Sequence, residues 1–265
     1  MLIVGERINT SRRPIAEATE KRDAAFICQE ARAQLEVGAS FLDVNAGTFG
    51  EKETENLIWL VKSIRSKVDS PLCIDSSDPE AIHAALEICG KGMMLNSISA
   101  EKEKYPAILP LIKEFGCKVV ALCLAGGEIP TELSSKLKIG LDLVEALLSD
   151  GVKAENIYVD PLIMAIGVDQ QTGRVALAMI KELKTKYPDI HTISGLSNIS
   201  FGLPVRKLLN RTFLTMAMAA GLDAVIMDPL DKEMMATLTA ANTLLGLDYC
   251  CGEYITAFRN NRLGR

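Results

Sequence analysis

Histidine and closely spaced cysteine pairs, the usual ligands of zinc, are scarce in this sequence. Its 265 residues include two histidines, His83 and His191, and seven cysteines, none of them in a Cys-x-x-Cys pair. Cys250 and Cys251 are adjacent, but no second ligand pair accompanies them. Structural zinc sites need such pairs, so we expect the protein to bind no metal of its own.

Long apolar runs, a secretory signal and an excess of basic residues are also missing. No run reaches the length of about 20 apolar residues that a membrane-spanning helix needs. The apolar run at the N-terminus is interrupted after five residues by the charged Glu6 and Arg7, so it is too short for a secretory signal. Lys and Arg total 29 against 34 Asp and Glu, a net charge of −5, whereas nucleic-acid-binding surfaces are usually basic. The cysteines lie among apolar residues, as reduced thiols do. We therefore expect a cytoplasmic protein that binds neither membranes nor nucleic acids.

Short β-branched runs alternate along the chain with longer amphipathic segments. Most of these runs are continuously apolar, which is typical of strands buried on both faces of a parallel sheet. Alternating strands and helices predict parallel strands joined by right-handed crossovers. The predicted strands cover residues 2–9, 41–47, 71–77, 92–99, 118–125, 157–164, 191–198 and 223–229.

Eight strands favour a closed barrel over an open sheet. An open, doubly wound sheet would usually carry Gly-x-Gly-x-x-Gly after its first strand, whereas this strand ends Gly5-Glu6-Arg7-Ile8-Asn9. A (β/α)8 barrel typically takes about 250 residues. We predict an α/β fold, one TIM barrel over residues 1–265, with one helix at 14–37 and irregular segments at 48–53, 126–134 and 199–205.

Polar residues gather at the ends of the predicted strands. In a barrel these ends meet at one mouth, where barrel enzymes have their active sites. Single residues of this kind often cap helices or loops, and Ser77 and Asp78 look like caps. Polar groups at so many strand ends are costly to bury unless a ligand pairs with them. The strand ends carry Glu6, Arg7, Asn9, Asp43, Asn45, Asp75, Ser76, Asn96, Ser97, Asp160, Ser197, Asn198 and Asp228.

The chemistry of this set favours a neutral heterocycle. Asp accepts hydrogen bonds and Asn both donates and accepts, which suits a ring edge with amino, imino and carbonyl groups, while several carboxylates would repel phosphate. A divalent metal on Asp43, Asp75, Asp160 and Asp228 is an alternative, and so is an acid–base pair of Asp75 with Asp160. The residue types leave these alternatives open.

Several segments resemble the methyltetrahydrofolate:corrinoid methyltransferases, in order and over essentially the whole chain. They are Val4-Gly5-Glu6-Arg7-Ile8-Asn9, Leu72-Cys73-Ile74-Asp75-Ser76, Leu95-Asn96-Ser97, Tyr158-Val159-Asp160-Pro161-Leu162 and the segment from Gly195-Leu196-Ser197-Asn198 to Pro204. The segments at 209–214 and 220–224 match as well. The same fold serves the folate domain of methionine synthase and, more distantly, dihydropteroate synthase.

The resemblance implies a role for each matching residue. Asp75, Asn96 and Asp160 correspond to residues that bind the pterin edge, and Asn198 to the asparagine at N5. Asn198, Asp75 and Asp160 are thereby the expected catalytic residues. Gly195, Ser197 and Arg206 fall in the same pterin-binding segment, while Glu6, Asn9 and Asp43 are expected at the floor or rim.

The resemblance also implies the substrates and partners. Methyltetrahydrofolate or tetrahydrofolate is the expected folate substrate, and cobalamin or another corrinoid would arrive on a partner protein that docks at the C-terminal face of the barrel. The transfer would be a direct displacement that can run in either direction. Members of this family often form homodimers, which we expect here.

Other functions compete with this one. A dihydropteroate synthase would need a lysine on the seventh strand and an Arg-Pro loop after the second, and the chain has neither. A non-catalytic folate-binding module would not turn over methyltetrahydrofolate. A metal-dependent lyase on a generic barrel would lose activity on chelation.

Overall fold

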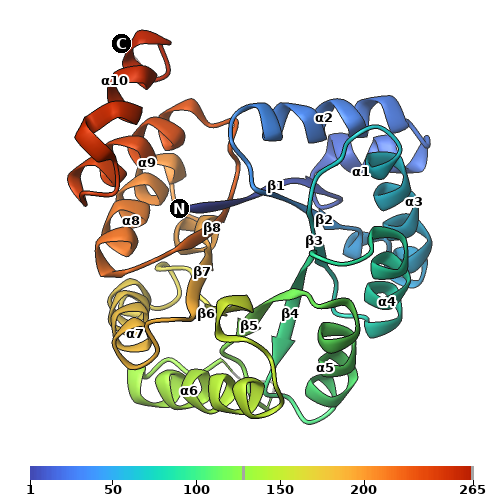
Figure 1. Ribbon diagram of the computed structural model, residues 1–265, viewed down its shortest axis with the longest axis horizontal. Coiled ribbons are helices and arrows are strands. Elements are labelled where there is room, and N and C mark those ends of the chain that lie inside the picture. The colour runs from blue at the N-terminus through green and yellow to red at the C-terminus, as the bar shows by residue number, and fades with distance from the viewer. Residues whose placement is uncertain (127–128, 264–265) are drawn as a thin grey trace.

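Eight parallel strands close into a barrel in the order β1 to β8. The computed structural model describes residues 1–126 and 129–263, and across them each strand pairs with its neighbours in sequence while β8 closes onto β1. The helices form a ring around the strands (Figure 1). The predicted fold is therefore confirmed. The strands are β1 (Leu2–Asn9), β2 (Phe41–Asn45), β3 (Leu72–Asp75), β4 (Met94–Ser99), β5 (Lys118–Leu122), β6 (Ile157–Asp160), β7 (His191–Gly195) and β8 (Ala224–Met227).

The helices follow the strands as the alternation predicts, with two differences. Residues 14–37 form two helices, because Arg22 takes a left-handed φ of +55° and Asp23 caps the second helix by accepting from the Phe26 N–H at 3.0 Å. A short 3₁₀ helix also follows each of β2 and β7. The helices are α1 (Arg13–Glu20), α2 (Ala24–Glu36), η1 (Gly47–Lys52), α3 (Glu53–Arg65), α4 (Pro79–Cys89), α5 (Lys104–Phe115), α6 (Leu133–Ser149), η2 (Ala154–Asn156), α7 (Thr172–Lys186), η3 (Leu196–Ser200), α8 (Arg206–Ala220), α9 (Lys232–Leu244), η4 (Tyr249–Cys251) and α10 (Gly252–Arg259).

An apolar plug fills the barrel interior below the mouth. Each strand contributes one buried side chain to it, and these pack into a single cluster. Successive side chains of a strand point to opposite faces, so this cluster fixes which residues of every strand face inward. The interior plug consists of Val4, Phe41, Cys73, Met94, Val120, Tyr158, Ile193 and Ala224.

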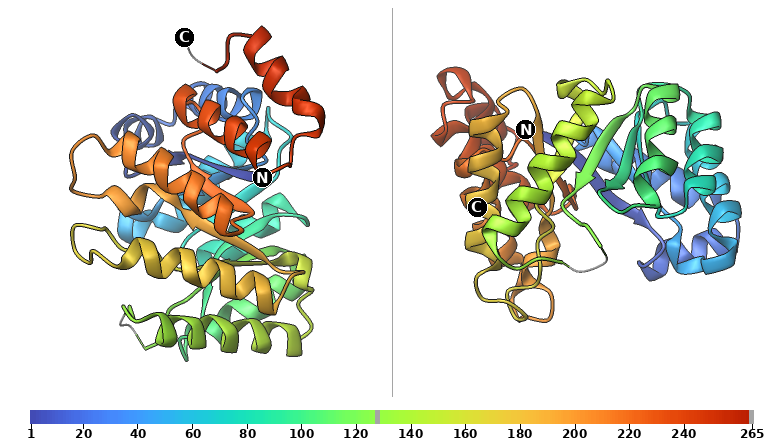
Figure 2. Two further views of the ribbon diagram at one scale, coloured as in Figure 1. Left: turned by 90° about the vertical axis from the view of Figure 1, so that its left-hand side faces the viewer. Right: turned by 90° about the horizontal axis from the view of Figure 1, so that it is seen from below.

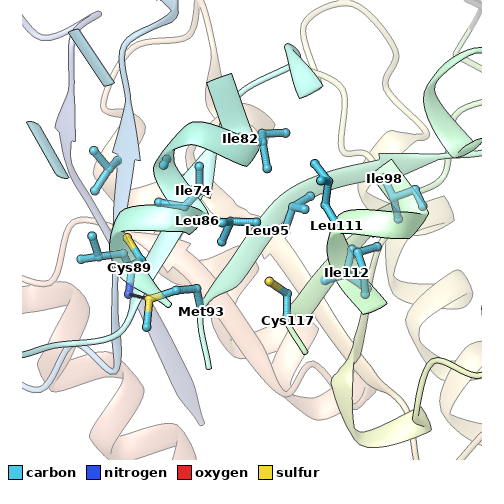
Figure 3. Close-up of a cluster of buried hydrophobic side chains, with 14 of the residues drawn as sticks. Ile74, Ile82, Leu86, Cys89, Met93, Leu95, Ile98, Leu111, Ile112 and Cys117 are labelled. Carbon is cyan, nitrogen blue, oxygen red and sulfur yellow. Dashed lines mark hydrogen bonds between the residues drawn. The ribbon is translucent and has the colours of Figure 1, made fainter. Parts of the chain in front are cut away.

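The outward faces of the strands pack against the helices. Between β3, β4, α4 and α5 the fully buried Ile74 and Leu95 lie against Leu86 and Leu111 in one cluster (Figure 3). Burial of this kind stabilises a side chain by about 1.5–3 kcal/mol. This part of the barrel wall is therefore apolar on its outer face and, at the level of the plug, on its inner face as well.

The loops after the strands lie at one end of the barrel. The yellow and orange loops that follow β6 and β7 project from the left-hand side of the left view in Figure 2. The predicted irregular segment 48–53 is mostly the 3₁₀ helix η1, and within 126–134 residues 127–128 lie outside the described residues. Among the described residues, no helix is both long and apolar enough to cross a membrane.

Candidate active site at the barrel mouth

The polar residues of the strand ends occupy the interior layer directly above the plug. In six strands the polar residue, or a glycine, lies two positions beyond the plug residue, so it faces the same interior. The predicted mouth therefore exists as one layer of the barrel. This layer comprises Glu6, Asp43, Asp75, Asn96, Asp160 and Gly195.

Asp43 and Asp75 are neighbouring carboxyl groups on β2 and β3. Asp43 is 2% exposed and its Oδ1 has no hydrogen-bond partner among the described residues. Burial, and then the charge of Asp75, raise its pKa well above the ordinary value. Burial also raises the pKa of Asp75 to about 6, although the Asn45 side chain opposes the rise. A layer with this much carboxyl character favours ligands that donate hydrogen bonds.

Asn45 fixes the orientation of Asp75. Its Nδ2 donates to Asp75 Oδ2 at 3.0 Å and to the Asp75 backbone carbonyl at 3.2 Å. Its Oδ1 accepts from the Gly47 N–H at 3.0 Å, at the start of η1. The sequence places Asn45 at a strand end but does not reveal this supporting role, which depends on the pairing of Asn45 with Asp75 between β2 and β3.

Asp160 ends β6 and is 8% exposed. Its Oδ1 accepts from the Leu162 N–H at 2.7 Å. Burial raises its pKa to about 6, while the backbone N–H groups of Leu162 and Gly195 and the charge of Lys136 act in the opposite direction. Asp160 is thus a buried acceptor whose carboxylate form is supported by fixed donors.

Glu6 lies on the β1 side of the mouth and is half-buried. Burial, followed by the charge of Asp228, raises its pKa to about 7, and Arg12 and Arg206 lower it by smaller amounts. The charge of Arg206, at the start of α8, therefore acts on Glu6. Glu6 can hold or release a proton near neutral pH.

Asn198 does not lie on β7, which ends at Gly195, but in the 3₁₀ helix η3. The side chain of Asn198 is exposed. Its amide nevertheless lies close to the end of β7, because a Cβ added to Gly195 would lie 3.4 Å from Asn198 Nδ2. Arg206 donates to the Ser197 carbonyl at 2.7 Å and to Ser200 Oγ at 3.1 Å. Arg206 therefore fastens the short helix that carries Asn198.

Some predicted mouth residues have structural partners instead. Asn9 Oδ1 accepts from the Ser11 N–H at 2.9 Å, which caps the turn before α1. Arg7 binds Asp228 and Glu30, each at 2.8 Å, and this network joins β1 to the end of β8 and to α2. Asp78 caps α4, as expected, by accepting from the Glu80 N–H at 2.9 Å.

Gly5 and Lys136 are structurally important residues that the sequence did not single out. A Cβ on Gly5 would lie 2.4 Å from Gln34 Oε1, the atom that accepts the Arg7 N–H. Lys136 is 2% exposed and donates to the Leu162 carbonyl, just after β6. A lysine in the first turn of a helix usually lies in solvent, so nothing in the local sequence indicated its burial.

The described residues contain no group of three or more His, Cys, Asp or Glu side chains that could hold a metal ion. Five of the cysteines are buried, while Cys250 and Cys251 are exposed. The mouth combines two acceptors, the half-buried Asp75 and the buried Asp160, with the amides of Asn96 and Asn198. These acceptors and amides match the hydrogen-bonding groups on the edge of a polar ring that carries N–H donors.

The raised pKa of Glu6 makes the stability of the protein depend on pH. From pH 4.5, the ordinary value, to about pH 7 the folded protein retains a proton that the unfolded chain releases, so stability falls as pH rises. Replacing Glu6 by Gln removes this cost. We expect E6Q to exceed the wild type in unfolding free energy by up to about 3 kcal/mol at pH 8 and to match it at pH 4.

Urea unfolding at the two pH values measures the difference. Glu182→Gln, at an exposed glutamate of α7, is the matched control. An E6Q advantage that is the same at both pH values would contradict the assigned environment of Glu6.

Known proteins have similar sequences. Residues 5–228 match the model of the pterin binding enzyme family. A methylcorrinoid:tetrahydrofolate methyltransferase of Eubacterium limosum is 39% identical over 266 residues, covering 100% of this chain and 98% of the relative. Methionine synthase of Mycobacterium tuberculosis is 29% identical over 239 residues, which is 85% of this chain and 20% of that protein.

Solved structures agree on the fold. Dihydropteroate synthase of Xanthomonas albilineans in complex with 7,8-dihydropteroate superposes with a TM-score of 0.70 at 17% identity, covering 94% of this chain and 93% of the other. The Yersinia pestis enzyme with a sulfonamide drug also gives 0.70, at 14% identity, over 93% and 94% of the two chains. With the polar layer at its mouth and a family model that matches most of its length, the chain belongs to the pterin-binding enzymes.

Proposed function

We propose that this chain is a methyltransferase that moves the N5 methyl group between methyltetrahydrofolate and the cobalt of a corrinoid protein. The observation that carries this proposal is the polar layer of Asp75, Asn96 and Asp160 beside Asn198, in a chain whose full-length relative is a methylcorrinoid:tetrahydrofolate methyltransferase. The reaction can charge the corrinoid or discharge it onto tetrahydrofolate.

Asp75, Asn96 and Asp160 bind the edge of the pterin ring. This edge carries amino and ring N–H donors beside a carbonyl acceptor. The carboxylates of Asp75 and Asp160 accept hydrogen bonds from the donors, and the Asn96 amide can either donate or accept a hydrogen bond. Burial raises the pKa of both Asp75 and Asp160 to about 6, and hydrogen bonds from the ring relieve the cost of keeping these groups charged.

Asn198 acts at the N5 side of the ring. A methyl group on a tertiary amine transfers poorly, because the electron pair of the breaking C–N bond stays on nitrogen. A hydrogen bond from Asn198 that strengthens as charge develops at N5 stabilises the transition state more than the bound substrate. The position of its amide over Gly195 at the end of β7 supports this role.

The transfer needs no covalent enzyme intermediate. In one direction the N5–CH₃ bond breaks with its electrons left on nitrogen, which takes a proton, and the cobalt(I) electron pair forms the cobalt–carbon bond. In the other direction N5 attacks the methyl group, loses its proton, and cobalt retains the electron pair. Burial raises the pKa of Glu6 to about 7, which suits this group to exchange that proton near neutral pH.

The corrinoid protein docks at the C-terminal face of the barrel. Large apolar side chains are exposed on the segments that follow β5, β6 and β7. An exposed apolar surface rimmed by polar groups is typical of a protein interaction site. These side chains are Ile129, Val168, Phe201, Val205 and Leu208, at 36%, 76%, 69%, 73% and 54% exposure.

Turnover separates methyl transfer from dihydropteroate synthesis, the reaction of the solved structures with this fold. We expect the purified protein to demethylate methyltetrahydrofolate in the presence of free cob(I)alamin, and to form no dihydropteroate from a pterin pyrophosphate and 4-aminobenzoate. The reason is the lack of a lysine on β7. Absorbance of methylcobalamin follows the first reaction and chromatography the second. Folate binding without turnover would indicate a non-catalytic module.

Replacing Asn198 by Ala should slow methyl transfer much more than it weakens folate binding. Loss of one hydrogen bond to developing charge costs about 2.7–4 kcal/mol in comparable sites, or 10²–10³-fold in rate. Single-turnover absorbance measures the rate and calorimetry the affinity. Asn260→Ala, at an exposed asparagine after α10, serves as control. An unchanged rate in N198A would remove Asn198 from the mechanism.

Replacing Asp75 by Asn should chiefly weaken binding. The amide keeps the shape but replaces a charged acceptor, which costs about 1.5–3 kcal/mol, or 10–150-fold in dissociation constant. Calorimetric titration with tetrahydrofolate measures the loss, and Asp69→Asn, a fully exposed aspartate before β3, is the control. Native affinity in D75N would show that Asp75 does not bind the pterin edge.

A further inference from the structure

Lys136 is a buried lysine in the first turn of α6, with 2% of its surface exposed. Burying an ammonium group is costly unless strong acceptors surround it. Its Nζ donates to the Leu162 carbonyl at 2.7 Å and to the Pro161 carbonyl at 3.2 Å. The side chain thus crosses from α6 to the two residues that follow Asp160 at the end of β6.

The backbone that Lys136 binds has an unusual conformation. Leu162 takes a φ of +52°, a left-handed conformation that costs a residue with a Cβ about 1–2 kcal/mol. This conformation coexists with the 2.7 Å hydrogen bond from the Leu162 N–H to Asp160 Oδ1. Because the carbonyl of the same residue binds Lys136, the ammonium group supports the geometry that orients the Asp160 carboxylate.

The charge of Lys136 acts on Asp160 as well. Burial lowers the pKa of Lys136, and the carboxylates of Asp160 and Asp169 act in the opposite direction. Around Asp160 the facing groups are Lys136 on α6, Cys123 after β5 and the Gly195 N–H on β7. Burial raises the pKa of Asp160, the backbone N–H groups of Leu162 and Gly195 lower it, and Lys136, the cation among these groups, lowers it further.

We propose that Lys136 is a positioning residue, which holds the turn of residues 160–162 and keeps Asp160 as a carboxylate directed into the mouth. This inference rests on the proposed function, because it takes Asp160 to be an acceptor for the pterin edge. Lys136 itself touches no substrate. Its effect on folate binding passes through Asp160.

A purely structural lysine is a poor explanation of this arrangement. Both carbonyls that Lys136 binds belong to the residues directly after Asp160. A neutral amide side chain could donate to both carbonyls without the cost of desolvating a charge. The benefit of a cation at this place is therefore its effect on the strand end, where the buried carboxylate lies.

A double-mutant cycle between Lys136 and Asp160 tests the proposal. The variants are Lys136→Met, Asp160→Asn and the pair, with Lys136→Gln as a second neutral variant that keeps donor groups. Lys138→Met, two positions along α6 and paired with the exposed Asp142, is the matched control. The readouts are calorimetric affinity for tetrahydrofolate, and kcat and KM for methyl transfer from methylcobalamin.

We expect K136M to raise KM for tetrahydrofolate about tenfold, with a smaller change in kcat. Removing the cation also raises the pKa of Asp160, so the acid limb of kcat/KM moves to higher pH, whereas K138M leaves it in place. In the D160N background K136M should change KM less than twofold, since its target is already neutral.

An additive cycle, or an acid limb that stays in place in both neutral variants, would overturn the positioning role. Failure of both neutral variants to fold would also overturn it, because the role would then be structural. If the wild type binds no tetrahydrofolate, the proposed function fails together with this inference. If the wild type binds and the cycle is additive, only the inference about Lys136 fails.

Discussion

The alternation of side chains along each strand, fixed by the interior plug, is the constraint on which the rest of the structure depends. Once Val4, Phe41 and Tyr158 point inward, the residues two positions later must point inward too. Those residues are Glu6, Asp43 and Asp160. A one-residue slip would turn the carboxyl groups into the apolar layer under the helices, at a cost that excludes it.

This constraint creates the electrostatics of the mouth. Carboxyl groups are forced into a poorly hydrated layer, and burial is the largest cause of the raised pKa of Glu6, Asp75 and Asp160. The protein offsets part of the cost with fixed donors, such as Asn45 for Asp75. One buried acceptor without a partner among the described residues, Asp43 Oδ1, belongs to the same layer. A ligand rich in N–H groups supplies what the layer lacks.

The strands and the segments that follow them carry different groups of the candidate site. Residues on β3, β4 and β6 are held in the sheet and suit recognition of a fixed ring edge. Asn198 lies beyond its strand in η3, fastened by Arg206. A similar barrel occurs in a dihydropteroate synthase that is 17% identical, so the fold alone does not determine which reaction is catalysed. The side chains at the strand ends and on the segments after them do so.

The sequence by itself determined the eight strands, the polar strand ends and the family, because apolar runs and short motifs are local signals. Only the tertiary structure decided which polar residues face the mouth and which are paired elsewhere. Asp228 meets Arg7, a residue 221 positions away, and Lys136 reaches across from α6 to the end of β6. Such pairings depend on closure of the barrel, which brings distant segments together. Local sequence patterns therefore do not predict them.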